Sequence, residues 1–168
     1  MRFFSTASAV CAAICVAASL VADAGLGSAN ADIIARYDCT IVGTMGLEPI
    51  GDRPGHMLVS FQYSCFATDG LMKGATYAAS VASEWENQKG TYLYGAGIHR
   101  SPEGYAVAVL TEGTGSAVMK NGAPTISEAT GKVAFKRASG RFAALEGRTA
   151  NFTARLIGPG HLVYELMD

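Results

Sequence analysis

Two stretches of alternating apolar and polar residues constrain the fold of this chain more than any other feature. In residues 33–41 the odd-numbered positions carry Ile, Ala, Tyr, Cys and Ile, and in residues 57–65 they carry Met, Val, Phe, Tyr and Cys. Between the two stretches, residues 51–55 read Gly-Asp-Arg-Pro-Gly, a dense cluster of turn-forming residues. Strand-like alternation on both sides of one turn predicts an antiparallel β-hairpin with one apolar face.

Cys39 and Cys65 are equidistant from the centre of that turn, so a symmetric hairpin places them opposite each other on the apolar face. Directly opposed residues of antiparallel strands bring their Cα atoms close enough for a disulfide. The alternative is a reactive thiol or a metal ligand, but neither cysteine belongs to a Cys-x-x-Cys motif, and no lysine or arginine neighbours them on that face. We therefore predict a structural Cys39–Cys65 disulfide, a bond that exported proteins form routinely.

The N-terminal segment has the pattern of a helical signal peptide. Arg2 is the only charged residue before the apolar stretch at residues 7–22, and residues 29–31 read Ala-Asn-Ala, a typical cleavage signal. An earlier cut after residue 24 is an alternative. A membrane anchor is a weaker alternative, because an alanine-rich stretch of this length falls short of the roughly 20 strongly apolar residues that span a bilayer.

Cleavage leaves residues 32–168 as one domain without a stable membrane span, and it predicts a periplasmic or secreted protein. The formal net charge is −1, with acidic and basic residues interspersed, which argues against nucleic acid as a partner.

Further turn-forming clusters recur at short intervals along this domain. They lie at residues 68–70, 87–90, 101–104, 113–115, 121–124 and 158–160. Short alternating runs between such turns are typical of an all-β domain, and we predict a single antiparallel β-barrel of about eight strands. Residues 71–86 are assigned to a strand, although their alanines also suit a helix. Residues 140–147 suit a helix of one or two turns.

Residues 131–135 (Gly-Lys-Val-Ala-Phe) and 139–147 (Ser-Gly-Arg-Phe-Ala-Ala-Leu-Glu-Gly) together resemble a motif of calycin-like, allene-oxide-cyclase-like small β-barrels. The resemblance covers residues 105–168 and implies an eight-stranded barrel with a central cavity. The cyclase residues of that family have no counterparts here, so no catalytic role is carried over. In physical terms, Gly140 and Gly147 bracket a tight connection, and we expect Phe142 and Leu145 to plug one end of the barrel.

The sequence offers little chemistry. His56, His99 and His161 are isolated from one another, so we expect no metal site and no cofactor. Nucleophile elbows and phosphate-binding loops are missing from the sequence as well. Glu84 and Glu86 flank Trp85, and a carboxylate pair beside an aromatic ring is found in sugar-cleaving enzymes, but a charged outer strand face is the simpler interpretation.

The aromatic residues suggest a function more clearly. Inward tyrosines in a small barrel can line a pocket with apolar walls and hydroxyls that orient a ligand. As lining residues we select Tyr37, Phe61, Tyr63, Tyr77 and Tyr92. The prediction is an exported, non-catalytic protein that holds a small apolar or amphipathic ligand. The alternatives are an isomerase or cyclase that uses the same cavity, and an interaction protein that uses its outer surface.

Overall fold

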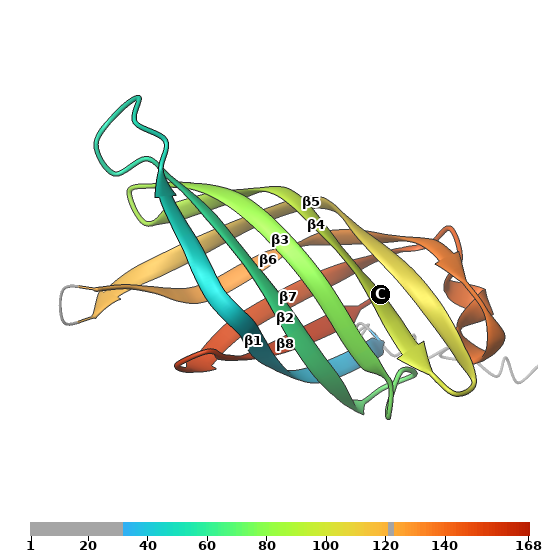
Figure 1. Cartoon of the computed structure of the whole chain (residues 1–168). Coiled ribbons are helices and arrows are strands. Elements are labelled where there is room, and N and C mark those ends of the chain that lie inside the picture. Colours follow the sequence, from blue (N-terminus) through green and yellow to red (C-terminus); the bar gives the residue numbers. More distant parts are fainter. Residues whose placement is uncertain (1–31, 121–122) are drawn as a thin grey trace, which may run out of the picture. The chain divides into compact units, whose positions relative to one another are not determined.

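The computed structural model describes residues 32–120 and 123–168, and they form a closed barrel of antiparallel strands (Figure 1). The elements are β1 (Ile33–Pro49), β2 (Met57–Asp69), β3 (Thr76–Glu86), β4 (Lys89–Ser101), β5 (Gly104–Lys120), β6 (Ala123–Ala138), the 3-10 helix η1 (Gly140–Leu145), β7 (Thr149–Gly158) and β8 (His161–Met167). The predicted signal peptide, and part of the predicted turn at residues 121–124, lie outside the described residues.

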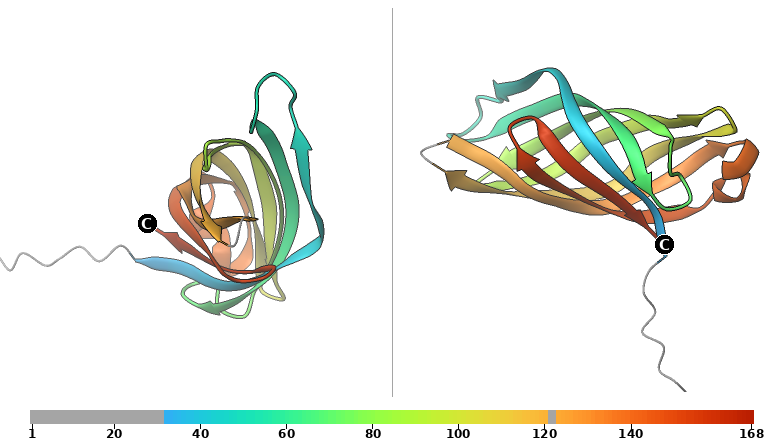
Figure 2. Two further views of the ribbon diagram at one scale, coloured as in Figure 1. Left: turned by 90° about the vertical axis from the view of Figure 1, so that its left-hand side faces the viewer. Right: turned by 90° about the horizontal axis from the view of Figure 1, so that it is seen from below.

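The barrel is a simple meander. Each strand pairs with the next along the chain, and β8 closes the barrel by pairing with β1, for example at Tyr37 and Tyr164. Figure 2 shows the strands encircling one axis. The predicted all-β, eight-stranded antiparallel barrel is therefore confirmed. Within the described residues no helix is long and apolar enough to cross a membrane.

The first hairpin has the predicted register. Cys39 pairs directly with Cys65, their Cα atoms are 4.0 Å apart, and the two residues form a disulfide. Both cysteines are buried on the inner face of the barrel. The predicted disulfide is confirmed, and bonds of this kind are typical of oxidising environments outside the cytoplasm.

Large inward side chains are accommodated by small residues on neighbouring strands. A Cβ atom on Gly115 would lie 2.9 Å from the Trp85 ring, and one on Gly97 would collide with the Tyr77 ring. The prediction of a chain break at residues 113–115 is therefore wrong: β5 runs through them, and their glycines make room for aromatic rings rather than for a turn.

The segment at residues 71–86 is a turn followed by a strand. Residues 71–74 form the turn, with Met72 buried beneath it, and β3 begins at Thr76. The strand assignment is confirmed from that residue onward, and the helical alternative is wrong.

One end of the barrel is closed by η1. Phe142 and Leu145 are buried in the interior, as predicted for a plug. The guanidinium of Arg141 lies 4.9 Å from the centre of the Phe142 ring and donates a hydrogen bond to the carbonyl of Lys73, at 2.7 Å. These contacts tie the plug to the turn between β2 and β3.

At the opposite end, the barrel wall is shorter on the side where β8 pairs with β1. The pairing of β1 with β8 ends at Thr40 and His161, followed by one hydrogen bond from the Ile41 N–H to the Gly160 carbonyl. Beyond this point the described part of β1 pairs only with β2. The short β7–β8 hairpin therefore leaves a notch in the barrel wall between β1 and β7.

Gly131 provides a test of the close approach between strands. A Cβ atom there would collide with the Glu112 carbonyl of β5 and lie 2.6 Å from the Gly113 Cα, so Gly131→Ala should push the strands apart. We expect the free energy of unfolding to fall by about 2 kcal/mol, as for other overpacked sites. Urea unfolding measures this, with Gly158→Ala as the control, because a Cβ atom at Gly158 meets nothing within 4 Å. Equal effects of the two substitutions would contradict the packing described here.

Candidate ligand-binding cavity

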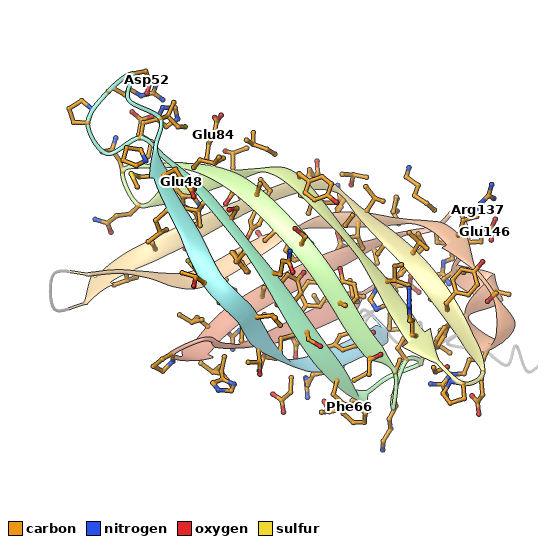
Figure 3. All side chains as sticks on the ribbon, in the orientation of Figure 1. Glu48, Asp52, Phe66, Glu84, Arg137 and Glu146 are labelled. Atoms are coloured by element: carbon orange, nitrogen blue, oxygen red, sulfur yellow. A yellow bond between two sulfur atoms is a disulfide. The ribbon has the colours of Figure 1, made fainter. Side chains whose placement is uncertain are left out.

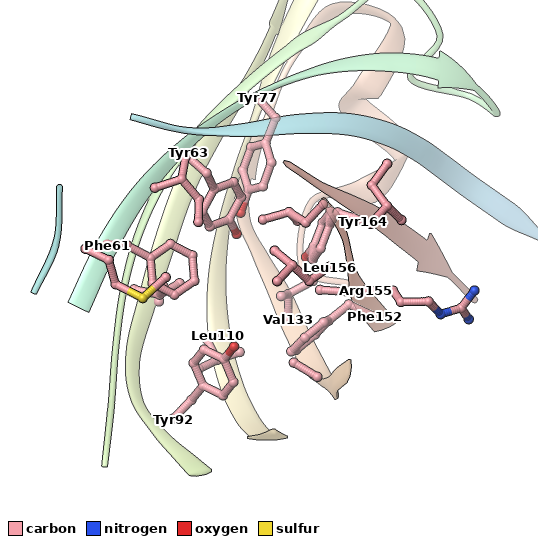
Figure 4. Close-up of a pocket in the computed structure, with 18 of the residues that line it drawn as sticks. Phe61, Tyr63, Tyr77, Tyr92, Leu110, Val133, Phe152, Arg155, Leu156 and Tyr164 are labelled. Atoms are coloured by element: carbon pink, nitrogen blue, oxygen red, sulfur yellow. The ribbon is translucent and has the colours of Figure 1, made fainter. Parts of the chain in front are cut away.

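The barrel encloses a cavity of about 550 Å³, within the size range of small-molecule sites (Figure 4). Every strand contributes to its lining, which follows from the inward-facing alternation of each strand. The lining residues are Ile41, Met45, Phe61, Tyr63, Tyr77, Val81, Tyr92, Gly95, Ala96, Leu110, Ala129, Val133, Phe152, Ala154, Arg155, Leu156, Ile157, Gly158, Pro159, Leu162 and Tyr164.

The cavity extends towards the notch in the barrel wall. Met45 on β1 and residues 156–159 around the β7–β8 turn belong to its lining, and the Ile157 side chain is largely exposed there. The plugged end, with Phe142 and Leu145, contributes nothing to the lining. We therefore take the notch as the mouth of the cavity and the plugged side as its floor.

Three tyrosines form the floor. The ring centres of Tyr63 and Tyr164 lie 5.8 Å and 5.7 Å from that of Tyr77, and all three side chains are buried. The rings of Tyr63 and Tyr164 also lie close to each other, with their centres 6.4 Å apart. We call this group the tyrosine cluster; Figure 4 shows it beside the apolar walls.

Burial keeps the phenols of the cavity neutral. It raises the pKa of Tyr77 to about 12, and it raises the pKa of Tyr63 and Tyr164 well above the ordinary value. Tyr92, on β4, packs edge-on against Phe152 at 6.5 Å, and burial raises its pKa to about 12 as well. These hydroxyls therefore serve as uncharged hydrogen-bonding groups across the neutral pH range.

The interior of the cavity carries no formal charge among the residues that line it. Arg155 is the one ionic residue of the lining, and it is exposed to solvent. Its guanidinium points away from the cavity in Figure 4. A charged group that entered the cavity would therefore meet no counter-ion there.

Four of the five residues selected from the sequence line the cavity, namely Phe61, Tyr63, Tyr77 and Tyr92. Tyr37 does not. It lies deeper in the barrel, where its hydroxyl is 2.6 Å from His99 Nδ1 and 3.0 Å from Met72 Sδ. Tyr37 faces inward as expected, but it is closer to the plugged end than Ile41, the first β1 residue of the lining.

The sequence interpretation did not select Phe152 and Tyr164, which also line the cavity. The signal was present in the C-terminal strands, where Ala150, Phe152, Leu162 and Tyr164 are buried at alternating positions. Strand periodicity extended to these residues would have indicated that they face inward.

His56, just before β2, is buried, and His161, at the start of β8, is exposed. His56 Nδ1 lies 2.6 Å from an Asp52 carboxylate oxygen, and His161 Nδ1 lies 3.5 Å from the Thr40 hydroxyl. His99 is buried, and its Nε2 has no hydrogen-bond partner among the described residues. Across the described part of the chain, no group of three or more His, Cys, Asp or Glu side chains could hold a metal ion.

The carboxylates beside Trp85 lie outside the barrel. Trp85 points inward, so its neighbours Glu84 and Glu86 point outward, and Figure 3 shows Glu84 near the β1–β2 hairpin. Glu86 accepts a hydrogen bond from Arg53 at 2.7 Å, and this bond lowers its pKa. Neither carboxylate lines the cavity, so the pair does not form a sugar-cleaving site there.

Comparisons with protein-family models, with curated proteins and with solved structures gave no match to this chain.

Proposed function

We propose that the protein is an exported carrier that binds a small apolar or amphipathic molecule inside the barrel. The observation that carries this proposal is the cavity of about 550 Å³, with aliphatic and aromatic walls, a floor of neutral hydroxyls and, among the described lining residues, no charged side chain except the outward-pointing Arg155. A few polar groups on an apolar surface are the usual composition of a small-molecule site.

Binding is favoured over catalysis by the chemistry of the lining. Acid–base catalysis needs a group that accepts or donates a proton near neutral pH. The lining residues contain no carboxylate, imidazole, thiol or amine, and burial raises the pKa of the phenols of Tyr77 and Tyr92 to about 12. An isomerase or cyclase that used this cavity would have to act only by holding its substrate in a reactive conformation.

Export to the periplasm or beyond is part of the proposal. The Cys39–Cys65 disulfide supports an oxidising compartment, and the sequence of residues 1–31 supports a cleaved signal peptide. A relationship to calycin-like barrels is likewise proposed, supported by the closed eight-stranded meander and its central cavity.

A binding assay tests the proposal. Trp85 is the single tryptophan of the chain, and its cluster packs against Phe61, which lines the cavity. We expect an uncharged naphthylamine probe to bind with one site per barrel and to change the Trp85 fluorescence. Ala129→Phe places an aromatic ring inside the cavity from β6. It should weaken probe binding at least about tenfold, because the new ring occupies the space in which the probe would contact the apolar walls.

Ala78→Phe is the matched control. Ala78 is exposed on β3 and points outward, so the same substitution there leaves the cavity unchanged. Circular dichroism verifies that both variants fold. Failure of the folded wild-type barrel to bind the probe would overturn the proposal, and so would equal binding by the Ala129→Phe variant.

A further inference from the structure

We propose that the protein forms a two-fold symmetric dimer, in which the outer face of β2–β5 packs against the same face of a second copy of the chain. This inference goes beyond the proposed binding function and does not depend on it. It is carried by the lack of charge on the central part of that face, by a groove that crosses it, and by large apolar side chains that protrude beside the groove.

The strands β2–β5 lie side by side and share an outer face whose central part carries no charged side chain among the described residues (Figure 1). We call this region the uncharged face. The first charged positions beyond it include Glu84, Arg100 and Glu112. The outward residues of the uncharged face are Ser60, Gln62, Ser64 and Phe66 on β2, Thr76, Ala78, Ser80 and Ala82 on β3, Thr91, Leu93, Tyr94, Ala96 and Ile98 on β4, and Tyr105, Val107, Val109 and Thr111 on β5.

The rest of the barrel wall has a different surface. On β1 and β8 the outward residues include Arg36 and Glu165, which form an ion pair at 2.6 Å. The outer faces of β6 and β7 carry the charged residues Glu128, Lys132 and Arg155. Depletion of charge together with exposed Tyr and Phe side chains distinguishes the centre of a protein interface from ordinary surface. The uncharged face has this composition, and the opposite wall does not.

The centre of the uncharged face is hollowed. A shallow groove crosses the four strands, and each of them contributes to its lining, with Gln62 on β2, Ala78 on β3, Ala96 on β4 and Val107 on β5. The groove follows from the sequence, because the outward residues at its centre are alanines and Ser80. Their short side chains leave space above the sheet that larger residues would fill.

A β-bulge places two large side chains beside this groove. Tyr92 pairs with Ser83 and Tyr94 pairs with Ala82, so Leu93 is the extra residue of β4. Tyr92 points into the cavity, whereas Leu93 and Tyr94 are 56% and 52% exposed. In a regular strand two consecutive residues face opposite sides of the sheet. The bulge thus produces a protrusion of two apolar side chains on the outer face.

The protrusion and the groove lie along the same strand, which suits a two-fold interface. In such an interface one patch serves both subunits, so a protrusion of each copy must meet a recess of the other. Leu93 and Ile98 are about 17 Å apart along β4. A two-fold axis near Ala96 therefore brings the Leu93–Tyr94 protrusion of each copy to the groove of its partner. The small side chain of Ala96 allows the two sheets to approach closely at the axis.

The size of the uncharged face suits a weak dimer. Four strands about 4.8 Å apart, followed over about seven residues each, cover roughly 20 Å by 23 Å. Two such faces in contact remove roughly 1,000 Å² from water, which is near the lower limit for a specific interface. A second copy brings no like charge to this contact, whereas a charged partner would find no opposite charge on it. The notch between β1 and β7 lies on the other side of the barrel, so both cavities stay accessible in the dimer.

Sedimentation velocity of the purified protein tests the proposal. An interface of this size predicts a dissociation constant of about 0.1 mM, so the weight-average mass should rise towards twice that of the monomer between about 5 μM and about 500 μM. Leu93→Arg should weaken dimerisation at least about tenfold, because it brings a charge into an apolar contact. Val118→Arg is the matched control: Val118 lies on β5 outside the uncharged face and is 58% exposed, so its replacement should leave dimerisation unchanged.

A crosslinking experiment locates the axis. Ala96→Cys should form a disulfide-linked dimer when copper phenanthroline oxidises it, because the two Cys side chains would meet near the axis. Thr130→Cys is the control, since Thr130 is exposed on β6, on the opposite wall. Adding Leu93→Arg to Ala96→Cys should reduce the yield of crosslinked dimer at least about fivefold. Circular dichroism verifies that each variant folds.

The proposal is overturned if the wild-type protein remains a monomer over this range of concentration, or if Leu93→Arg and wild-type protein dimerise equally. Equal loss in Val118→Arg, or equal crosslinking of the two Cys variants, would also contradict it. Binding of monomeric protein to phosphatidylcholine vesicles through Leu93 would assign the face to a membrane instead. The naphthylamine probe separates these results from the binding function, because Leu93→Arg should bind the probe as tightly as wild-type protein does.

Discussion

Replacing Cys39 and Cys65 together by alanine is expected to lower the free energy of unfolding by about 3.5 kcal/mol. The disulfide joins residues 26 positions apart, and in the loop-closure description it lowers the entropy of the unfolded chain by an amount that grows with the logarithm of that separation. The native barrel should change little, because the β1–β2 pairing continues on both sides of the bridge, from Arg36 with Asp69 to Pro49 with Met57. Urea unfolding followed by Trp85 fluorescence measures the difference.

Reduction of the wild-type protein provides the control. Dithiothreitol opens the same crosslink without changing the sequence, so reduced wild-type protein and the double variant should unfold at similar urea concentrations. The double variant should show no further change when the reductant is added. If oxidised wild-type protein and the double variant unfold at the same urea concentration, the bridge contributes nothing to stability.

The first hairpin was predictable from sequence because its determinants are local. The turn at residues 51–55 and the alternation on both sides fix which residues face each other, and a shift of one residue would turn Tyr37, Cys39 and Tyr63 to the solvent. The plug at residues 140–147 was predictable for the same reason. There, Gly140 and Gly147 have positive φ angles and enclose one short helical turn.

The position of a residue along the barrel axis was not predictable in this way. Alternation shows that Tyr37 and Tyr63 both face inward, but their depth depends on the tilt and stagger of all eight strands. Tyr37 therefore lies below the cavity floor, whereas Tyr164, distant in sequence, completes that floor beside Tyr77. The cavity is a property of the closed sheet, so the pattern of any single strand specifies only part of it.

Glycines were ambiguous for a related reason. The same residue marks a turn at Gly160, where the φ angle is positive, and leaves space for Trp85 at Gly115, within a continuous strand. The sequence signal distinguishes the two roles only when the opposing side chain is known.

The second large effect is expected in acid. Burial lowers the pKa of His99 to about 3, while an imidazole in the unfolded chain has a pKa of 6.5. Between these values the unfolded chain binds a proton that the folded barrel excludes, so the stability that is complete above about pH 6.5 is lost as the pH falls. From about pH 7.5 to about pH 4.5, His99 should account for a loss of about 3 kcal/mol in the free energy of unfolding.

His99→Phe isolates this contribution. Phenylalanine retains a planar ring against Tyr77, on which His99 stacks at 4.0 Å, and it removes the group that titrates. Urea unfolding at the two pH values should therefore show a much flatter dependence in this variant. The carboxyl groups of Asp52 and Glu86, whose pKa values are lowered by hydrogen bonds from His56 and Arg53, contribute mainly below this window and equally in both proteins.

Tyr37→Phe is the matched control for the acid effect. It removes the hydroxyl 2.6 Å from His99 Nδ1 but keeps the buried imidazole, so the full loss between the two pH values should remain. If His99→Phe and wild-type protein lose the same stability on acidification, the acid effect arises elsewhere, and His99 takes up its proton in the folded barrel nearly as readily as in the unfolded chain. The free energy of unfolding should therefore depend little on pH in His99→Phe and strongly on pH in Tyr37→Phe. That combination would assign the acid sensitivity of the barrel to the buried His99 ring, because only His99→Phe removes the group whose protonation requires unfolding.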